Sequence, residues 1–517
     1  MSNTTENNTT KRTKKQISAN ERISDNNARL WGIEPTDRGY KVNAQMLIKR
    51  YIQSRPLAYA GNGIYYEYVK GVWVETDEVE IKKRLLLVVD HFVPYLWGKC
   101  GYSLNSSVSN LLPLLCRNFS KLTPATNFIN LENGLLDLST FTLKPHNKRF
   151  ASLVKLPFDY DQEAKCPRFQ EFLRHVFREN EELINLVQEI MGYCLSSSTE
   201  AQKFFILYSD GASGKSVLCS ILQHLAGGDK NVSSVTLSNL NQKFQRAELF
   251  GKIVNISTEN EVSKFNTEAL KSITSGDPIQ IEHKFRKPFT TRLTAKLLFA
   301  MNSLPEPQDK TFAFYRRLVL VPFKTKFVDN PREGTNEMQR NPKIEEGLLE
   351  ELPGILAWCI EGLKRLVENN YQFTRSQEAD KLMLDYRKDI SPVFSFIAES
   401  IEEYTPENSD SSLSNDERIS TQDLFDAFDY WRMKNGIKGR FDKRDFLKSL
   451  REGLKECNIP FTESHSGNLR YFEGICLTQH APRSINDFDD DLYDFDDLLD
   501  DVEDEGDCEV EYIEDEE

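Results

Sequence analysis

The feature that most constrains the fold of this chain is a glycine-rich loop between two apolar runs. Residues 203–227 read KFFILYSDGASGKSVLCSILQHLAG, which predicts a strand, then the loop, then a helix. This order is the context that a phosphate-binding P-loop requires. Backbone N–H groups of such a loop and the N-terminus of the following helix can face a phosphate group. The segment therefore predicts a nucleotide site at the end of a buried strand.

Individual residues of this loop have distinct expected roles. We expect Lys215 to bridge the β- and γ-phosphates of ATP and the Ser216 hydroxyl to hold Mg²⁺. Ser209 stands where the usual motif has its first glycine, and Gly211 is the candidate to supply the missing flexibility. The alternative is a chance Gly-Lys-Ser sequence in a turn. The predicted nucleotide-binding residues are Ser209, Asp210, Gly211, Ala212, Ser213, Gly214, Lys215, Ser216 and Val217.

A second acidic segment is expected to complete the site. Residues 251–261, GKIVNISTENE, predict a short strand that delivers Glu259 and Glu261 to its C-terminal end. One carboxylate there can bind Mg²⁺ while the other orients or deprotonates an attacking water. Glu259 is the candidate metal ligand, although the pattern leaves the division of roles open. The alternative is a surface acidic pair at a strand end.

Two later segments carry polar residues at the ends of predicted strands. In residues 295–305, AKLLFAMNSLP, Asn302 is placed to hydrogen-bond a γ-phosphate or the lytic water, or simply to form a turn. Residues 314–323, FYRRLVLVPF, put Arg316 and Arg317 directly before another strand. An arginine that reaches a neighbouring subunit's γ-phosphate stabilises the charge of the transition state. The alternative for this pair is a surface ion pair.

Composition separates an acidic tail from a mildly basic body. The net charge is −15, but residues 484–517 hold 19 Asp and Glu and no Lys or Arg, which leaves 61 acidic and 65 basic residues before them. Nucleic acid therefore stays open as a partner. No apolar run of 18 residues and no signal peptide occur, so we expect a cytoplasmic protein without a membrane span. Nine cysteines without a CxxC pair argue against a zinc ribbon.

Changes of pattern along the chain predict an α/β protein in several parts. Strands alternate with helices up to about Phe323, which favours a largely parallel sheet. After Pro392, three helices precede a hairpin that turns at residues 466–468, which is the order of a winged helix. The expected parts are a disordered tail (1–28), a mixed α/β accessory domain (29–160), a helical oligomerisation or collar segment (161–199), a P-loop ATPase core (200–330), an associated helical segment (331–390), a winged-helix DNA-binding domain (391–483) and an acidic disordered tail (484–517).

Taken together, the motifs resemble a known family. The P-loop, the Glu-rich segment, TEALKSITSGDPIQIEHKFRKPF, AMNSLP and YRRLVLVPF follow the order found in superfamily 3 helicases. The resemblance is to the group at the C-terminus of phage and plasmid primase proteins and in poxvirus-type helicase–primases, and it covers roughly residues 60–480. It implies an AAA+-type ATPase that forms a homohexameric ring. Such a ring uses ATP and Mg²⁺ to unwind duplex DNA, usually moving 3′ to 5′.

The resemblance also implies roles for single residues. A hairpin tip at Lys284 and Phe285, flanked by His283, Arg286 and Lys287, would enter the central channel and grip single-stranded DNA. The alternative is a hairpin with solvated bases and a buried Phe285. Arg317 matches the trans-acting arginine, with Arg316 as second choice. Lys271 matches a lysine of the family pattern and is either near a neighbour's nucleotide or on a helix surface.

Three functions remain open from the sequence. The first is a replicative helicase of a phage, plasmid or similar mobile element, and the second is a bifunctional primase–helicase. For priming, Asp159 and Asp161 superficially resemble a two-metal carboxylate pair, but they lie in a linker-like stretch. The third is an origin-binding initiator whose ATP site only controls assembly. The acidic tail is expected to dock on a replication partner, to compete with DNA, or only to aid solubility. The expected winged-helix DNA contacts are Lys438, Arg440, Lys443, Arg444, Lys448, Arg451 and Arg470.

Overall fold

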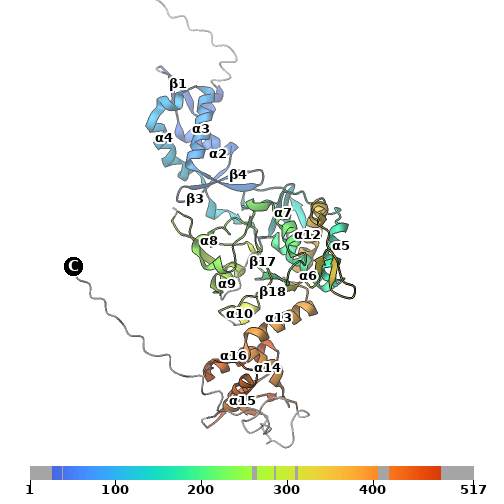
Figure 1. Ribbon diagram of the computed structural model, residues 1–517. Helices are drawn as coiled ribbons and strands as arrows, with labels where there is room; N and C mark the ends of the chain where they lie inside the picture. The colour runs from blue at the N-terminus through green and yellow to red at the C-terminus, as the bar shows by residue number, and fades with distance from the viewer. Residues whose placement is uncertain are drawn as a thin grey trace, which may run out of the picture. The chain divides into compact units, whose positions relative to one another are not determined.

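The computed structural model describes residues 26–37, 39–258, 265–284, 287–308, 312–405, 418–439, 441–467 and 469–478. The chain is mixed α/β, as the sequence predicts, and divides into two compact units, Met1–Leu384 and Asp385–Glu517 (Figure 1). Residues 26–30 are helical and Ala28 is buried, so helical structure already includes the last residues of the expected N-terminal tail. No helix in the described ranges is long and apolar enough to span a membrane.

The first part of unit 1 packs helices against a small sheet. The turn at Lys70 and Gly71 joins two strands, and both residues have positive φ. The helix at residues 44–54 was not predicted, although Asn43 caps it by accepting a hydrogen bond from the Met46 N–H. The elements are β1 (Ile33–Thr36), β2 (Gly39–Val42), α2 (Ala44–Ser54), β3 (Leu57–Gly61), β4 (Ile64–Val69), β5 (Val72–Asp77), α3 (Glu78–Phe92), α4 (Leu96–Leu115) and β6 (Arg117–Asn118), with the larger sheet ordered β5-β4-β3-β6.

The next segment belongs to a different hydrophobic core from the one that precedes it. Its hairpin turns at Asn133 and Gly134. Ile129, Leu136 and Leu156 are buried in the same cluster as the central sheet, whereas residues 28–112 have a core of their own. The expected accessory domain 29–160 therefore contributes to these two cores and to a third, smaller cluster that contains Ala58, Tyr66, Trp73 and Leu122. Its remaining elements are η1 (Phe119–Lys121), β7 (Thr123–Pro124), β8 (Phe128–Leu131), β9 (Gly134–Asp137), β10 (Thr142–Lys144) and β11 (Phe150–Ala151).

The central sheet of unit 1 contains five parallel strands in the order β13-β14-β17-β12-β18. Strands β12 and β17 at its centre are almost continuous apolar runs, which is typical of a parallel sheet covered on both faces. Helices α6 and α7 pack against β17 (Figure 1). The strands are β12 (Phe204–Tyr208), β13 (Val232–Ser233), β14 (Val254–Ser257), β17 (Lys296–Met301) and β18 (Leu318–Pro322), and the helices on this core are α5 (Pro167–Phe177), α6 (Glu181–Cys194), α7 (Lys215–Ala226) and α12 (Leu352–Glu368).

Helices α6 and α12 cross at unusually short range. A Cβ atom on Gly192 would lie 2.2 Å from the carbonyl oxygen of Cys359, so only glycine permits this approach. Buried Glu189 accepts hydrogen bonds from Arg365 Nε and from the backbone and hydroxyl of Thr374, each at 2.7 Å. Residues 161–199, expected as a collar segment, thus form part of the central core; their role in oligomerisation stays a prediction.

A smaller group of elements lies between β13 and β18. An antiparallel hairpin, β15 (Pro278–Ile281) and β16 (Phe289–Arg292), follows α9 (Glu268–Ser275) after two residues. Its tip is the segment that the resemblance assigns to the DNA channel. The other elements of this group are η3 (Ser238–Asn241), α8 (Lys243–Ala247) and α10 (Phe312–Tyr315), and η2 (Gly228–Lys230) lies just before β13.

The segment after β18 contacts the loop that follows β12. Strands β19 (Lys326–Val328) and β20 (Glu337–Gln339) pair in parallel, and α11 (Ile344–Leu349) follows. The backbone N–H of Phe327 donates to the carbonyl of Ala212 at 2.7 Å, which joins β19 to the loop after β12. Helix α13 (Gln377–Ile390) contains the boundary between the two units.

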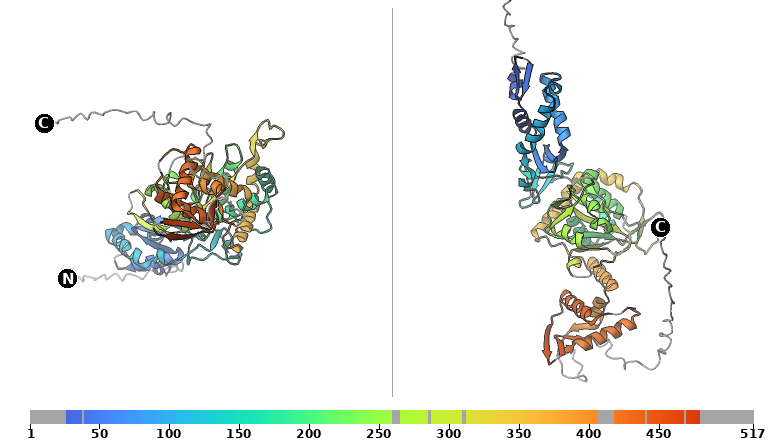
Figure 2. Two further views of the ribbon diagram at one scale, coloured as in Figure 1. Left: turned by 90° about the horizontal axis from the view of Figure 1, so that it is seen from below. Right: turned by 90° about the vertical axis from the view of Figure 1, so that its left-hand side faces the viewer.

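Unit 2 has its own aromatic core, built on Phe396, Phe428, Trp431, Phe446 and Phe472. The three predicted helices and the hairpin are present, and an additional strand, β22, joins the hairpin (Figure 2). Ser420 caps α15 by accepting a hydrogen bond from the Asp423 N–H. The elements are α14 (Pro392–Ser400), β21 (Ile401–Glu403), β22 (Arg418–Ser420), α15 (Thr421–Lys434), α16 (Lys443–Glu456), β23 (Thr462–Ser466), β24 (Leu469–Glu473) and β25 (Ile475–Leu477).

Candidate nucleotide-binding site

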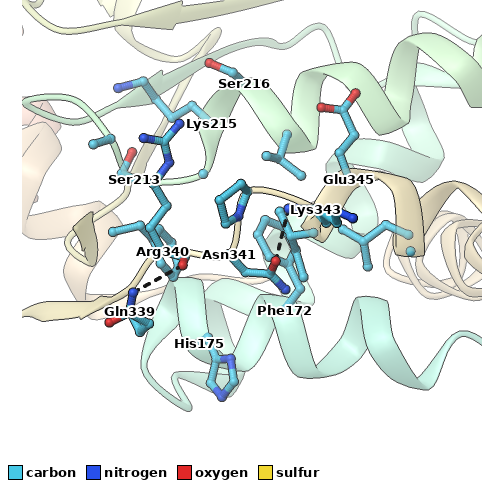
Figure 3. A pocket seen from close by; sticks show the side chains of 18 of the residues that line it. Phe172, His175, Ser213, Lys215, Ser216, Gln339, Arg340, Asn341, Lys343 and Glu345 are labelled. Carbon is cyan, nitrogen blue, oxygen red and sulfur yellow. Dashed lines mark hydrogen bonds between the residues drawn. The ribbon is translucent and has the colours of Figure 1, made fainter. Parts of the chain in front are cut away.

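A cavity of about 990 Å³ opens at the carboxyl ends of the central strands. It is lined by loop residues 211–217 after β12, by Thr258 after β14 and by Asn302 after β17. Figure 3 shows Ser213, Lys215 and Ser216 of this loop at the cavity. In open α/β sheets, ligands bind at this edge, outside the carboxyl ends of the strands. The structure thus brings the predicted loop and Asn302 to one cavity, although they are separated by more than eighty residues in the sequence.

Lys215 lies at the base of this cavity and is buried, with 7% of its surface exposed. Its ammonium group donates to the carbonyl and hydroxyl of Ser209 and, at 2.9 Å, to Oδ1 of Asn302. Burial lowers the pKa of Lys215, whereas nearby Asp210 opposes that shift. The amine is therefore held by neutral acceptors and has no carboxylate partner in the described ranges, which suits a group that receives an anion.

The backbone conformation of the loop explains why residues 211 and 214 are glycines. Gly211, Ala212 and Gly214 all have positive φ. A Cβ atom on Gly214 would lie 3.2 Å from a methyl group of Val176, so this glycine also allows the loop to pack on α5. Because positive φ is strained for side chains other than Asn and Asp, the two glycines fit the path of the loop.

Ser209, the departure from the usual motif, has a clear structural place. Its hydroxyl lies 2.7 Å from the Ser213 hydroxyl and accepts a hydrogen bond from the Gly211 N–H at 3.2 Å. The same hydroxyl accepts a hydrogen bond from Lys215. A serine at this position therefore links the two ends of the loop to the lysine, which a glycine cannot do.

The far wall of the cavity comes from α5 and from the segment after β20, and the sequence motifs did not indicate it. Arg340 and Lys343 lie on this wall, and Figure 3 shows the Arg340 side chain extending toward Ser213 and Lys215. In the described part of the chain, neither cation forms an ion pair. Arg168 and His175 of α5 complete the wall. No local signal could have found these residues, because they reach the cavity through tertiary packing alone.

The expected metal site is only partly described. Glu259 and Glu261 lie outside the described residues, and Thr258, the residue before them, lines the cavity. Across the described ranges, no group of three His, Cys, Asp or Glu side chains is arranged to hold a metal ion. Mg²⁺ bound to a nucleotide needs only one or two protein ligands besides phosphate oxygens and water. The exposed hydroxyl of Ser216, at the start of α7, fits that requirement.

The two consecutive arginines have opposite environments. Arg317 is buried, and its guanidinium donates to the Ala313 carbonyl at 2.6 Å and to the Ser275 hydroxyl at 2.9 Å. Arg316 is exposed and lines a second cavity of about 700 Å³ together with Lys203, whose ammonium donates to the Arg316 carbonyl. Burial lowers the pKa of Lys203, and the charges of Arg316 and Arg317 lower it further. This second cavity lies at the amino ends of β12 and β18, opposite the first.

The candidate DNA contacts are partly described. Lys284 and Lys287 are exposed at the end of the β15–β16 hairpin, whereas Phe285 and Arg286 lie outside the described residues. His283 stacks on Phe289 with ring centres 6.1 Å apart. Lys271 is half-buried on α9. The structure therefore forms the expected hairpin without describing its aromatic tip.

The residues considered for priming lie in a loop. Asp159 and Asp161 are exposed between β11 and α5. Oδ1 of Asp161 accepts a hydrogen bond from the Glu163 N–H at 3.0 Å, which is a turn-forming contact. This contact gives Asp161 a local structural role.

The basic residues of unit 2 gather on one helix and the hairpin beside it. Arg444 and Lys448 of α16 and Arg470 of β24 are exposed. Arg451 pairs with Glu463 of β23 at 2.7 Å, which ties the helix to the hairpin. Lys438 is exposed and Lys443 donates to Gln422, whereas Arg440 lies outside the described residues.

Comparisons with known proteins agree with the motifs. Residues 44–178 match the family described as D5 N terminal like, and residues 207–317 match a family of unknown function, DUF5906. A protein with helicase in its name, L207/L206 of Acanthamoeba polyphaga mimivirus, is 22% identical over 62% of the chain. Another, 121R of Invertebrate iridescent virus 3, is 21% identical over 62% of the chain. The resemblance to phage and viral superfamily 3 helicase–primases is confirmed.

The matched relatives are much longer than this chain. It spans 38% of the mimivirus protein and 37% of the iridescent virus protein. Among solved structures, the apo C-terminal region of NrS-1 aligns with a TM-score of 0.42 and 11% identity, and the alignment covers 83% of this chain and 98% of that one.

Proposed function

We propose that this protein is an ATP-dependent replicative DNA helicase of a phage, plasmid or similar mobile element, working as a homohexameric ring. The observation that carries the proposal is the cavity at the carboxyl ends of the parallel strands, where Lys215, Ser216 and Asn302 meet. The helicase names of the two viral relatives support the same activity.

In this proposal the triphosphate of ATP lies along the 209–216 loop. Backbone N–H groups at the start of α7 and the Lys215 ammonium bind the phosphates, and the Ser216 hydroxyl is a Mg²⁺ ligand. Bound Mg²⁺ supplies Lewis-acid stabilisation of the phosphate charge. Asn302, which already contacts Lys215, is placed to orient the γ-phosphate or the lytic water. Glu259 and Glu261 follow Thr258 in the chain and are proposed to share the metal and water roles.

Arg316 is the proposed trans-acting arginine, in place of Arg317, which the family pattern favours. Arg316 precedes β18, whereas the loop follows β12, and these two parallel strands pair along their whole length. Five residues of strand separate the two ends by about 16 Å, at roughly 3.3 Å per residue. An arginine side chain cannot cover that distance to its own nucleotide. It can reach the nucleotide of a second copy in a head-to-tail ring, where every subunit presents one end of its sheet to the other end of the next.

Two surfaces are proposed to bind DNA. In the ring, Lys284 and Lys287 of each hairpin face the channel and contact phosphates of a single strand. In unit 2, α16 and the β23–β24 hairpin are proposed as a winged-helix surface for origin duplex DNA, with Arg444, Lys448 and Arg470 as phosphate or base contacts. The order of one helix, two strands, two helices and a hairpin supports that assignment.

The test is ATP-driven unwinding of a forked duplex by the wild type, Lys215→Ala, Arg316→Ala and a mixture of the two variants. We expect only the wild type to unwind the duplex. Mixing should restore ATP hydrolysis at about a quarter of the subunit interfaces, because one interface in four then pairs an intact loop with an intact arginine.

Each alternative function has its own outcome in this experiment. If the wild type binds ATP and DNA but never separates strands, the helicase proposal is wrong and an origin-binding initiator becomes the explanation. Template-directed primer synthesis in the same reactions would instead indicate a primase–helicase. If mixing restores nothing, Arg316 is not the trans-acting arginine.

A further inference from the structure

The C-terminus of α9 is held between two arginines from different elements. Arg317, which precedes β18, donates from Nη2 to the hydroxyl of Ser275, the last residue of α9. Arg292, the last residue of β16, donates from Nη1 to the carbonyl of Gly276, the next residue. The turn at residues 275–276 is thus bonded on one side to the arginine pair and on the other to the hairpin.

This turn cannot move without moving the hairpin. Only Gly276 and Asp277 separate α9 from β15, and Gly276 adopts φ +68. A Cβ atom at Gly276 would lie 2.6 Å from the Thr199 hydroxyl, so the turn is packed as well as hydrogen-bonded. The β15–β16 hairpin carries Lys284 and Lys287 at its far end.

The Arg317 side chain is buried and makes its hydrogen bonds within its own chain. Its side chain is 8% exposed, and two of its donors bind oxygen atoms of its own chain, Ala313 and Ser275. Its Nε atom is buried without a hydrogen-bond partner in the described ranges. The guanidinium therefore faces inward, while the adjacent Arg316 faces the second cavity.

We propose that Arg317 is a positioning residue that couples the nucleotide interface to the DNA hairpin through Ser275, Gly276 and Arg292. This inference rests on the proposed helicase function. When Arg316 engages a neighbour's phosphate, the backbone at residues 316–317 is held in one position. Because Arg317 is hydrogen-bonded to Ser275, the end of α9 is then held in place as well. The end of α9 in turn fixes the position of β15. The path is a short chain of direct contacts that ends on the hairpin, and its energetic coupling can be measured.

The test uses the full chain and compares ATP hydrolysis with and without single-stranded DNA, together with unwinding. The variants are Ser275→Ala, Arg292→Met, Arg317→Met and Arg317→Lys. Ser272→Ala is the matched control, because Ser272 lies on the same helix without a hydrogen bond to Arg317. We expect Ser275→Ala and Arg317→Met to hydrolyse ATP without DNA within about twofold of the wild type, but to lose DNA stimulation and unwinding by at least about fivefold.

The effects of substituting Arg317 and Arg292 should also be non-additive. In an Arg317→Met, Arg292→Met double variant, the loss of DNA stimulation should be less than the product of the two single losses, because both substitutions break one path. Arg317→Lys should recover part of the coupling, since a lysine keeps the charge and can still donate to one of the two oxygens.

Several results would overturn the inference. If Arg317→Met abolishes hydrolysis without DNA, and mixing with Lys215→Ala restores it, Arg317 is the trans-acting arginine instead. DNA stimulation that survives in Ser275→Ala contradicts the path even where Arg317→Met fails to fold. A wild type that shows no ATP-driven unwinding refutes the underlying function, which is a different failure from that of the coupling.

Discussion

Lys296 is a fully buried lysine at the start of β17. It has 3% of its surface exposed and donates to the carbonyls of Ser196 at 2.9 Å and Thr294 at 2.6 Å, without an ion-pair partner in the described part of the chain. Burial lowers its pKa from 10.5 to about 7. The unfolded chain therefore binds more protons than the folded chain between pH 7 and 10.5, and the contribution of Lys296 to stability rises with pH across that window.

Replacing Lys296 with methionine should remove this dependence. The free energy of unfolding of the wild type, minus that of Lys296→Met, should rise between pH 7 and pH 9.5 by up to ~1.4 kcal/mol per pH unit. Urea unfolding at three pH values measures the difference, and subtracting the variant cancels the other titrating groups. A difference that stays constant with pH would mean that the folded lysine keeps an ordinary pKa.

The Ser209 hydroxyl supports a second prediction at the residue scale. Ser209→Ala removes the oxygen that accepts from Lys215 and pairs with Ser213. Because a hydrogen bond to a charged group contributes ~1.5–3 kcal/mol, the Kd for ATP should rise by about tenfold or more. Calorimetric titration measures the change, and Ser238→Ala, outside the cavity, is the control. Unchanged ATP affinity would show that the hydroxyl does not prepare Lys215 for the phosphate.

The sequence reveals only one side of this site. The loop and Asn302 were predicted because each follows an apolar strand, and such strands end at the same edge of a parallel sheet. Arg340 and Arg168 follow no strand of that sheet and match no motif, so their place in the cavity depends on tertiary packing. Sequence spacing also could not show which of Arg316 and Arg317 is the trans-acting arginine, because these neighbours differ only in burial.

At the scale of elements, the close crossing of α6 and α12 depends on glycine. Gly192→Ala would place a Cβ atom 2.2 Å from a backbone oxygen of α12 and 2.9 Å from the Leu363 Cβ. Helix separation must then increase, and we expect a loss of ~1–3 kcal/mol in the free energy of unfolding. Gly98→Ala in α4 is the matched control, because nothing lies within 4 Å of the added atom there. Equal thermal stability of the two variants would contradict the packing argument.

Elements with regular apolar spacing could be predicted from the sequence, whereas α2 was not predicted although Asn43 caps it. Helices α5 and α6 show apolar residues at helical spacing, and the strands of the central sheet are short apolar runs, so both were predicted. The start of α5 has no local side-chain cap. Instead, the Glu351 carboxylate, almost two hundred residues away, accepts from the N–H groups of Arg168 and Phe169. A cap of this kind leaves no trace in the local sequence.

At the scale of the whole molecule, the two units have separate cores. A chain that ends at residue 390 keeps α13 intact and loses the aromatic core of unit 2. We expect its Kd for ATP to stay within about twofold of the full chain, while affinity for duplex DNA falls and its dependence on salt becomes weaker by about one unit of slope per lost phosphate contact. Fluorescence anisotropy at several salt concentrations measures both. Arg444→Ala with Lys448→Ala in the full chain should reproduce part of the loss; unchanged duplex affinity in both proteins would contradict this role of unit 2.

The hydrogen bond between Phe327 and Ala212 joins two segments of the cavity that a ribosome makes at different times. The cavity needs α5, which is made before the central sheet, and the segment after β20, which is made after it. A chain emerging from a ribosome therefore passes through a stage in which the glycine-rich loop exists without its far wall. ATP that binds only the complete cavity stabilises the protein only after every wall of that cavity has folded. Until residue 348 has emerged, the sheet must fold and persist by its own packing, without help from its nucleotide.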